Sequence, residues 1–385
     1  MKIALIRKDY IASRGGAEQY AVNLARGLAD RGHEIHVFAG SHDHEPHPDI
    51  SVHTVPFFRF PSALKNLSFH SNTRRLIARQ PFDIINGLSQ TFPQDIYRLG
   101  DGIHLHWLKV QTPNPRKRFL KYFSPRHLAI LLIEHHIFKT GNFRHIIANS
   151  QLCKNQLMHY YGIAPEAITV VHNGVDTVRF TPDTRAQRRD AARRRLGLQG
   201  TETVMLFAGH NFKRKGLQFA VQTLAGLKQR GCSCKLLVSG RGNPQPFLKL
   251  ARSMDVASRL HFLGPTNTIE ELYAAADLLI HPALYDPFSN VCLEALACGL
   301  PVVTSSMNGA AEIIADGRSG LVVELPWDSN HMTAAIHEAL SSTRSGLAVM
   351  GTAAAAAARQ FTIGRNIAET LMVYEKVFEQ KRRNL

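Results

Sequence analysis

The chain has 385 residues, 44% of them hydrophobic and 20% charged, and its formal net charge at pH 7 is +16. Single hydrophobic cores rarely grow beyond about 250–300 residues, so this length predicts two domains. No apolar run approaches the roughly 20 residues of a membrane-spanning helix, and the apolar start is too short for a signal peptide, so we expect a cytoplasmic protein. The positive charge indicates an anionic partner, such as a phospholipid surface, a phosphorylated glycan or a nucleic acid.

The five cysteines contain one C-x-C pair and no C-x-x-C pair, at Cys153, Cys232, Cys234, Cys292 and Cys298. This spacing favours neither a zinc site nor a disulfide framework, so we expect reduced thiols. The sequence offers no metal site, and we predict none.

The first forty residues have the order strand, loop, helix, strand. A strand is predicted over Lys2–Ile6, a helix from about Ala17 to Arg31 and a second strand over Glu34–Ala39. This order is a Rossmann-like opening, although the dinucleotide fingerprint G-x-G-x-x-G is absent. Gly15 and Gly16 before the helix let a ligand approach the backbone and expose N–H donors to a phosphate, but adjacent glycines are also common in ordinary turns.

Short apolar runs alternate with helical stretches through the rest of the first half. Strands are predicted over residues 51–55, 83–87, 96–99, 145–148 and 168–172. This alternation argues for a parallel sheet covered by helices on both faces.

The segment from Arg98 to Arg144 is strongly basic. Its only acids are Asp101 and Glu134, and aromatic and aliphatic residues are interleaved with nine cations: Arg98, Lys109, Arg116, Lys117, Arg118, Lys121, Arg126, Lys139 and Arg144. Such a mixture suits a surface that sits on anionic lipid headgroups. A solvated basic helix face explains it equally well, and single-stranded nucleic acid is a less favoured partner.

Residues 173–198 interrupt the pattern and are interpreted as the linker into a second domain. They end in an arginine-rich run: Arg185, Arg188, Arg189, Arg193, Arg194 and Arg195. We expect an exposed helix with solvent-facing arginines, and anion binding is the less favoured role.

The second half repeats the strand–loop–helix order. A strand over residues 203–208 is followed by the loop 209–216, which holds His210, Arg214 and Lys215. Cations at a strand end and helix start suit a pyrophosphate, because charge-assisted donors there neutralise the ligand, but a plain basic loop is also possible. The next strands, 235–239 and 260–263, end at Gly240-Arg241-Gly242 and at Gly264.

The most informative stretch reads HPALYDPFSNVCLEALACGLPVVT, from His281 to Thr304. Asp286 before Pro287 predicts a helix N-cap, so the helix would start there and Gly299 would end it. The first amides of that helix would bind an anion: Phe288, Ser289, Asn290 and Val291. Glu294, roughly two turns further on in an apolar helix, needs a partner, whereas Asp286 taken alone is most simply a cap.

The carboxyl ends of parallel strands meet at one edge of a sheet. We therefore expect the residues that follow the strands of the second half to converge at one crevice: His210, Arg214, Lys215, Gly240, Gly264 and the mouth of the 286 helix.

Taken together, these motifs resemble a retaining glycosyltransferase of family 4, and the resemblance covers almost the whole chain. Its most specific part is LYDPFSNVCLEALACGLPVV, similar to the family's E-x7-E segment with Asp286 in place of the first Glu. RGGAE at Arg14–Glu18, VHNGVD at Val171–Asp176 and KRKG at Lys213–Gly216 support it. The resemblance implies an α/β protein of the GT-B fold, with two Rossmann-like domains facing each other across a cleft.

By this likeness residues 1–174 form the acceptor-binding domain, with a C-terminal helix of about 363–385 packed back on it. Residues 175–362 form the nucleotide-sugar-binding domain. Glu294 would accept the donor's ribose hydroxyls, and Asp286 would contact hydroxyls of the donor sugar. Arg214 and Lys215 would hold the diphosphate as it leaves, in place of a metal.

The likeness also assigns a phosphate cradle, made by the amides of Ser289, Asn290 and Val291 with the Gly15-Gly16 backbone across the cleft. The family usually has an arginine directly after the strand's glycine, where this chain has His210. Arg214 would substitute for that arginine.

Within the family the pattern is most similar to lipopolysaccharide-core glucosyltransferases that extend the inner heptose. That similarity implies UDP-glucose as donor, a phosphorylated core sugar of a lipid-anchored glycan as acceptor, and a peripheral position on the inner face of the cytoplasmic membrane. It places Asp101 and His104 toward the acceptor and Arg179 beside the donor, although a surface carboxylate and a satisfied histidine are simpler readings. No nucleic acid is expected.

Three alternatives stay open from sequence. The protein could be another family 4 transferase acting on a different cell-envelope polysaccharide or glycolipid. It could be a GT-B nucleotide-sugar epimerase that needs no acceptor. It could also be a non-enzymatic protein that uses its charge to bind polyanions or membranes.

Overall fold

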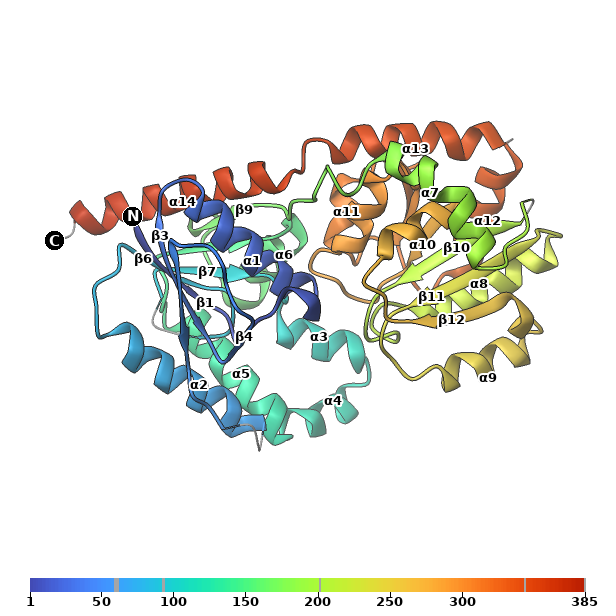
Figure 1. The fold of residues 1–385 in the computed structure, drawn as a ribbon. Helices are drawn as coiled ribbons and strands as arrows, with labels where there is room; N and C mark the ends of the chain where they lie inside the picture. Colours follow the sequence, from blue (N-terminus) through green and yellow to red (C-terminus); the bar gives the residue numbers. More distant parts are fainter. Residues whose placement is uncertain (59–61, 92–93, 201, 343, 384–385) are drawn as a thin grey trace. The chain divides into compact units, whose positions relative to one another are not determined.

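The protein is described by a computed structural model that covers residues 1–58, 62–91, 94–200, 202–342 and 344–383 (Figure 1). The chain divides into two compact units. Unit 1 comprises Met1–Asn173 with Ile363–Leu385, and unit 2 comprises Gly174–Thr362. Each unit is built around one main parallel sheet, so the α/β class expected from the alternating pattern is confirmed.

The main sheet of unit 1 has seven strands, and each neighbouring pair is parallel. In spatial order they are β5 (Ile50–Thr54), β3 (Glu34–Ala39), β1 (Lys2–Ile6), β6 (Ile84–Gly87), β7 (Ile96–Leu99), β8 (His145–Ala148) and β9 (Ile168–Val170). A small parallel ribbon joins β2 (Asp9–Tyr10) to β4 (Ser41–His42).

Helices cover both faces of this sheet. The helices of unit 1 are α1 (Gly16–Ala29), α2 (Ser62–Ile77), α3 (His104–Gln111), α4 (Pro115–Tyr122), α5 (Pro125–Lys139), α6 (Gln151–Tyr161) and α14 (Ile363–Arg383). Strand β1 shows why both faces are apolar: Ile3 and Leu5 pack with α1 and α14, whereas Ala4 and Ile6 pack on the side of α2. Side chains of a strand point alternately to the two faces, so a strand buried on both sides needs a continuous apolar run.

The C-terminal helix α14 belongs to unit 1 although it follows unit 2 in the sequence. Tyr374 is fully buried and accepts a hydrogen bond from Asn86 on β6. Near the helix start, Asn366 Nδ2 donates to the His172 carbonyl at 2.6 Å. Figure 1 shows this helix alongside α1, and residues 384–385 of its expected extent lie outside the described residues.

The sheet of unit 2 has six parallel strands. Their order is β12 (Leu260–Gly264), β11 (Cys234–Ser239), β10 (Thr203–Ala208), β13 (Leu278–His281), β14 (Val302–Ser305) and β15 (Gly320–Val323). The helices are α7 (Pro182–Arg195), α8 (Leu217–Gln229), α9 (Gln245–Ser253), α10 (Ile269–Ala275), α11 (Asn290–Ala297), α12 (Ser329–Ser341) and α13 (Arg344–Ala358).

Two expectations from the sequence are wrong in this unit. Helix α11 starts at Asn290 with Ser289 at its N-cap, so Asp286 does not cap it and Pro287 is not its first residue. Residue 286 instead forms an isolated parallel bridge with Asn308. This long-range pairing holds residues 286–289 outside the helix, and the two acids therefore do not lie on one helix.

The arginines of α7 do not all face solvent. Three of them are spaced by four residues and pack against the C-terminal end of α10: Arg185, Arg189 and Arg193. They donate to backbone oxygens of Tyr273, Ala274, Ala275 and Ala276. The last carbonyls of a helix lack partners inside the helix and carry partial negative charge, so guanidinium groups satisfy them well.

Candidate active site

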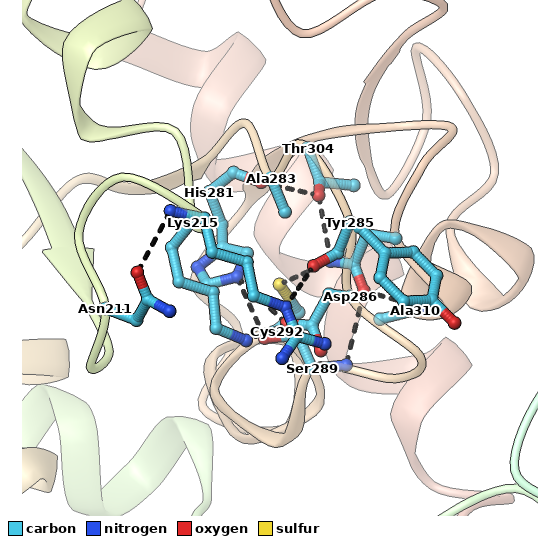
Figure 2. A network of polar contacts seen from close by, with 12 residues as sticks. Asn211, Lys215, His281, Ala283, Tyr285, Asp286, Ser289, Cys292, Thr304 and Ala310 are labelled. Carbon is cyan, nitrogen blue, oxygen red and sulfur yellow. Dashed lines mark hydrogen bonds and ion pairs between the residues drawn. The ribbon is translucent and has the colours of Figure 1, made fainter. Parts of the chain in front are cut away.

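The centre of the candidate site is a buried ion pair between Lys215 and Asp286 (Figure 2). Only 4% of Asp286 is exposed. Lys215 Nζ contacts Asp286 Oδ2, and the same oxygen lies 3.2 Å from His281 Nε2. Burial by itself raises the pKa of Asp286, but Lys215, His281 and Arg214 outweigh it and hold that pKa well below its usual value. Asp286 is therefore a carboxylate at any ordinary pH.

Gly216, the residue after Lys215, allows the close packing that places Lys215 here. Gly216, directly before α8, has a φ of +80°, and a Cβ there would lie 1.8 Å from the Pro282 carbonyl oxygen. A side chain at 216 is excluded because the loop presses on the backbone at the exit of β13. The requirement for glycine in KRKG is thus explained by this close approach.

The segment that follows β14 holds both peptide groups of Asp286. Its amide donates to the Met307 carbonyl at 3.0 Å, and its carbonyl accepts from the Gly309 amide at 2.9 Å. Between these two residues, Asn308 Oδ1 accepts from the amides of Ser289 at 3.2 Å and Ala310 at 3.1 Å. The Ser289 amide therefore has a partner within unit 2, and its share in the anion cradle stays a prediction.

Arg214 lies beside this ion pair. Its Nε donates to the Tyr285 carbonyl at 2.9 Å, and its guanidinium carbon lies 5.3 Å from the centre of the Tyr285 ring. The Leu284 amide donates back to the Arg214 carbonyl at 2.9 Å. The loop after β10 is thus tied to the loop after β13, and the two cations predicted from the sequence, Arg214 and Lys215, lie together.

Glu294 is partly buried on α11 and has a specific partner. The Tyr273 hydroxyl of α10 donates to Glu294 Oε2 at 2.7 Å. Burial raises the pKa of Glu294 to about 7, although the Tyr273 hydrogen bond and the charge of Arg179 oppose this rise. A carboxylate in this position is an acceptor for hydroxyl groups, and it titrates in the physiological range.

The glycines at the carboxyl ends of three strands approach one another closely. A Cβ on Gly240 would lie 1.9 Å from the Gly209 carbonyl oxygen, and the Gly240 amide donates to the Gly264 carbonyl at 3.0 Å. The Arg241 amide donates to His210 Nδ1 at 3.0 Å. The expected convergence at the carboxyl edge of this sheet is therefore observed, and both His210 and Arg241 are exposed there.

Arg179 is engaged elsewhere in unit 2. Its Nη2 donates to Glu270 Oε2 at 2.7 Å and to the Asn267 carbonyl at 3.2 Å. The positive charge of Arg179 lowers the pKa of Glu294. Arg179 thus lies on the Glu294 side of the unit, and a direct contact with the donor stays a prediction.

Unit 1 carries the other predicted residues. Gly15 precedes α1, which begins at Gly16. Asp101 is exposed and lies 3.5 Å from Arg7 Nη1, and Arg7 Nη2 donates to Glu18 Oε1 at 2.7 Å. Arg7 thus joins a carboxylate after β7 to one on α1 at the carboxyl edge of the sheet.

His104 is held at the start of α3. Its amide donates to Glu134 Oε1 at 2.7 Å, and its Nε2 lies 3.0 Å from His127 Nδ1. Burial raises the pKa of Glu134 to about 7, although the amides of His104 and Leu105 oppose this rise. His104 is therefore engaged within unit 1, and its role toward an acceptor stays a prediction.

Several residues of these networks are not predicted from the sequence: Arg7, Glu18, Glu134, Tyr273, His281 and Asn308. His281 ends strand β13 and precedes a proline, which is the best available signal. Tyr273 looks like an ordinary core residue of α10, and nothing local marks Asn308. The partners of Tyr273 and Arg7, Glu294 and Asp101, lie 21 and 94 residues away in the sequence, so local patterns carry no information about these pairs.

Across the described ranges, no three or more His, Cys, Asp or Glu side chains are grouped so as to hold a metal ion. In the same part of the chain, no helix combines the length and apolar character that crossing a bilayer requires.

Comparison with known proteins identifies the family. A model of glycosyltransferase family 4 matches residues 14–179, and a model of glycosyl transferases group 1 matches residues 188–356. A probable transglycosylase of Burkholderia thailandensis is 30% identical over 362 residues, which are 93% of this chain and 92% of that protein. This chain belongs to the group 1 and family 4 glycosyltransferases. It is a nucleotide-sugar-dependent hexosyltransferase.

Other relatives agree with this assignment. The lipopolysaccharide glucosyltransferase WaaG of Escherichia coli K12 is 26% identical over 330 residues, 86% of this chain and 87% of that protein. The crystal structure of WaaG superposes with a TM-score of 0.84 at 24% identity and covers 97% of this chain and 99% of that one. Anabaena HepE in complex with UDP-glucose has a TM-score of 0.73 at 21% identity, over 97% of this chain and 100% of that one. The GT-B fold, with two Rossmann-like halves, is thereby confirmed.

Proposed function

We propose that this glycosyltransferase moves glucose from UDP-glucose, with retention of configuration, onto a phosphorylated core sugar of a lipid-anchored glycan such as lipopolysaccharide. The observation that carries the proposal is the placement of Arg214 and Lys215 together at the carboxyl edge of the unit 2 sheet. The similarity to WaaG over most of both chains supports the choice of glucose and of this acceptor class.

The diphosphate of the donor is assigned to Arg214 and Lys215. Both side chains are fixed by partners within unit 2, so they are organised before a ligand arrives. Preorganised cations stabilise negative charge as it develops on the leaving diphosphate, without reorganisation at the moment of reaction. We propose that they act in place of a metal ion. The share of Gly15, Gly16, Phe288, Asn290 and Val291 in a phosphate cradle stays a prediction.

The ribose is assigned to Glu294. Its second carboxylate oxygen has to accept hydroxyl protons from the ligand, while Oε2 is held by Tyr273. A site built to hydrogen-bond hydroxyl groups discriminates strongly against analogues that lack them. We therefore expect a 2′-deoxy donor to be a poor substrate.

A front-face route fits these residues. The departing diphosphate would help to deprotonate the acceptor hydroxyl, and the acceptor oxygen would bond to the anomeric carbon on the same face. Asp101 and His104 are proposed on the acceptor side, where Asp101 is exposed and negatively charged groups suit sugar hydroxyls.

The membrane surface is assigned to α4 and α5. Four apolar side chains on these helices or on the link between them are 60% exposed or more: Phe119 at 60%, Leu120 at 72%, Phe123 at 65% and Leu132 at 60%. Arg116, Lys117 and Arg126 are exposed on the same two helices. Exposed apolar groups with cations are suited to an anionic bilayer surface, and we propose peripheral binding at the inner face of the cytoplasmic membrane.

Part of the basic segment is excluded from this surface. Arg98 is buried, its guanidinium carbon lies 3.4 Å from the centre of the Tyr20 ring, and it donates to Asn173. Arg98 is a structural cation of unit 1, which narrows the predicted segment to the helices that follow.

The test is transfer of radiolabelled glucose from UDP-glucose to purified core glycolipid, with GDP- and ADP-glucose run in parallel. Glu294→Ala should reduce transfer by at least about 100-fold with an unchanged fold, whereas the exposed Glu338→Ala should match the wild type. Full activity of Glu294→Ala would contradict the site. Interconversion of UDP-sugars without any acceptor would indicate an epimerase instead.

A further inference from the structure

We propose that Asp286 is a positioning residue, which holds Lys215 against the donor's diphosphate and makes no contact with the donor sugar itself. The inference rests on the proposed function only in assigning the diphosphate to Lys215. It gives the acid at this position a different role from the sugar contact that the family resemblance implies.

The residues of the polar network drawn in Figure 2 differ in how deeply their side chains are buried. The side chain of His281 is 0% exposed, that of Asp286 is 6% exposed and that of Lys215 is 20% exposed. Lys215 is therefore the member that a ligand reaches most easily. Asp286 Oδ2, by contrast, is already engaged by Lys215 Nζ and lies 3.2 Å from His281 Nε2.

The backbone also keeps the Asp286 carboxylate in place. Hydrogen bonds to Met307 and from Gly309 fix the peptide groups of Asp286, and Pro287 restricts its conformation from the following position. Aspartate is one methylene shorter than glutamate. A carboxylate on this fixed backbone therefore stays near the ion pair and does not extend as far toward a ligand.

His281 supports the same arrangement from the inside of the unit. Its ring stacks on Phe207 with the centroids 6.0 Å apart, and its Nε2 also lies 3.3 Å from Ser289 Oγ. His281 and Lys215 thus contact the same carboxylate oxygen, and Lys215 is the more exposed of the two. Any effect of Asp286 on the donor passes through Lys215.

This arrangement makes a prediction that a sugar ligand does not make. If Asp286 acts through Lys215, its loss weakens the binding of the nucleoside diphosphate and of the nucleotide sugar by the same factor. If Asp286 contacts the sugar, its loss weakens the binding of the nucleotide sugar and leaves the Kd of the nucleoside diphosphate unchanged. The ratio of the two dissociation constants therefore distinguishes the roles.

The experiment measures calorimetric Kd values of UDP and UDP-glucose for the full chain and for Asp286→Asn, which keeps the shape and removes the charge. We expect both Kd values to rise about 10- to 100-fold with their ratio unchanged, because a small misplacement of a binding group is costly. A rise for UDP-glucose alone would overturn the proposal, and so would no rise for either ligand.

A second variant keeps the test valid if Asp286→Asn folds poorly. In Lys215→Met/Asp286→Asn both charges are absent, so no unpaired charge is buried. If Asp286 acts only through Lys215, this double variant should bind UDP and UDP-glucose within about twofold of Lys215→Met, since coupled residues are not additive. A further loss for UDP-glucose would identify Asp286 as a sugar ligand.

The matched control is Asp255→Asn. Asp255 forms an ion pair with Lys228 in the same unit, but its side chain is 96% exposed, so both Kd values should stay at the wild-type level. The same measurements with GDP and ADP and their glucose derivatives separate the two proposals. If another base binds in place of uridine, the assignment of UDP-glucose fails, and the Kd ratio of the preferred pair still tests Asp286.

Discussion

The hydroxyl of Tyr273 donates a 2.7 Å hydrogen bond to Glu294 Oε2. Tyr273 is fully buried on α10, and Glu294 is partly buried on α11. The arginines of α7 donate to backbone carbonyls at the C-terminal end of α10, and one of these carbonyls is that of Tyr273. A chain of contacts thus runs from the arginine-rich helix to the carboxylate that we assign to the ribose.

Tyr273→Phe should shift the pH dependence of donor binding. The Tyr273 hydrogen bond lowers the pKa of Glu294, which burial raises to about 7, so the variant should have a higher Glu294 pKa. Since protonation removes the acceptor that holds the ribose, KM for the donor should rise below about pH 7 in the wild type and already at a higher pH in the variant.

The measurement is KM and kcat between pH 5.5 and 9. A purely structural role of Tyr273 would change the level of KM without moving its pH midpoint. That outcome would contradict the assignment of Tyr273 to Glu294.

Glu294→Gln should stabilise the protein at pH 8 while it weakens donor binding. A carboxyl whose folded pKa of about 7 lies above its ordinary value of 4.5 binds more protons in the folded state between these values. Stability is therefore lost as pH rises from about 4.5 to 7, and glutamine avoids this loss. We expect a gain on the order of 1–2 kcal/mol at pH 8 and almost none at pH 4.5, from urea unfolding at both values.

Lys215→Met should destabilise the fold more than the double variant Lys215→Met/Asp286→Asn. The single change leaves the Asp286 carboxylate buried without its cation and should cost about 3 kcal/mol, whereas removing both charges costs less. Urea unfolding at pH 7.5 checks the difference. Equal losses in the two variants would show that the ion pair does not compensate the buried charge.

Arg193→Ala should destabilise unit 2. Arg193 is 6% exposed and donates to the carbonyls of Ala275, Gln199 and Glu202 at 3.0, 2.6 and 2.8 Å. Leaving these oxygens without a donor should cost about 2–3 kcal/mol, because buried acceptors lose their partners. The neighbouring Arg194 is exposed, so Arg194→Ala provides the control and should unfold at the wild-type midpoint.

Replacing Phe119, Leu120 and Phe123 together by serine should reduce binding to vesicles that contain anionic lipid. Each of these side chains is at least 60% exposed on or directly after α4, so its removal should leave the core intact. Flotation with anionic and with neutral vesicles measures the effect. Met372→Ser, at a 66% exposed position on α14, should bind as the wild type does, and equal flotation of both variants would contradict the assigned surface.

The local pattern predicts most of the sheet strands accurately. The bounds of β1, β3, β7, β8 and β10 agree with expectation, because apolar runs between turn signals have no competing structure. The start of α11 was predicted wrongly, since Asp286-Pro287 satisfies the local rules for a helix start. A bridge to Asn308 overrides those rules, and its partner lies outside any local window.

The prediction that the arginines of α7 face solvent was wrong for the same reason. Charge spacing along a helix predicts a solvated face when the neighbouring element is unknown. The carbonyl end of α10 is more than 80 residues away in the chain, and it changes Arg193 from a surface cation into a buried donor.

By itself the sequence indicated the family, the two α/β halves and the charged residues of the candidate site in unit 2: Arg214, Lys215, Asp286 and Glu294. These follow from motifs and periodicities whose physical causes act over a few residues. Only the tertiary structure decided how those groups pair. Lys215 and Asp286 are 71 residues apart and meet because a glycine lets one loop press on another, while Tyr273 reaches Glu294 from a different helix. At these meeting points the cations around Asp286 lower its pKa, whereas burial raises the pKa of Glu294, so two acids of one motif have opposite properties.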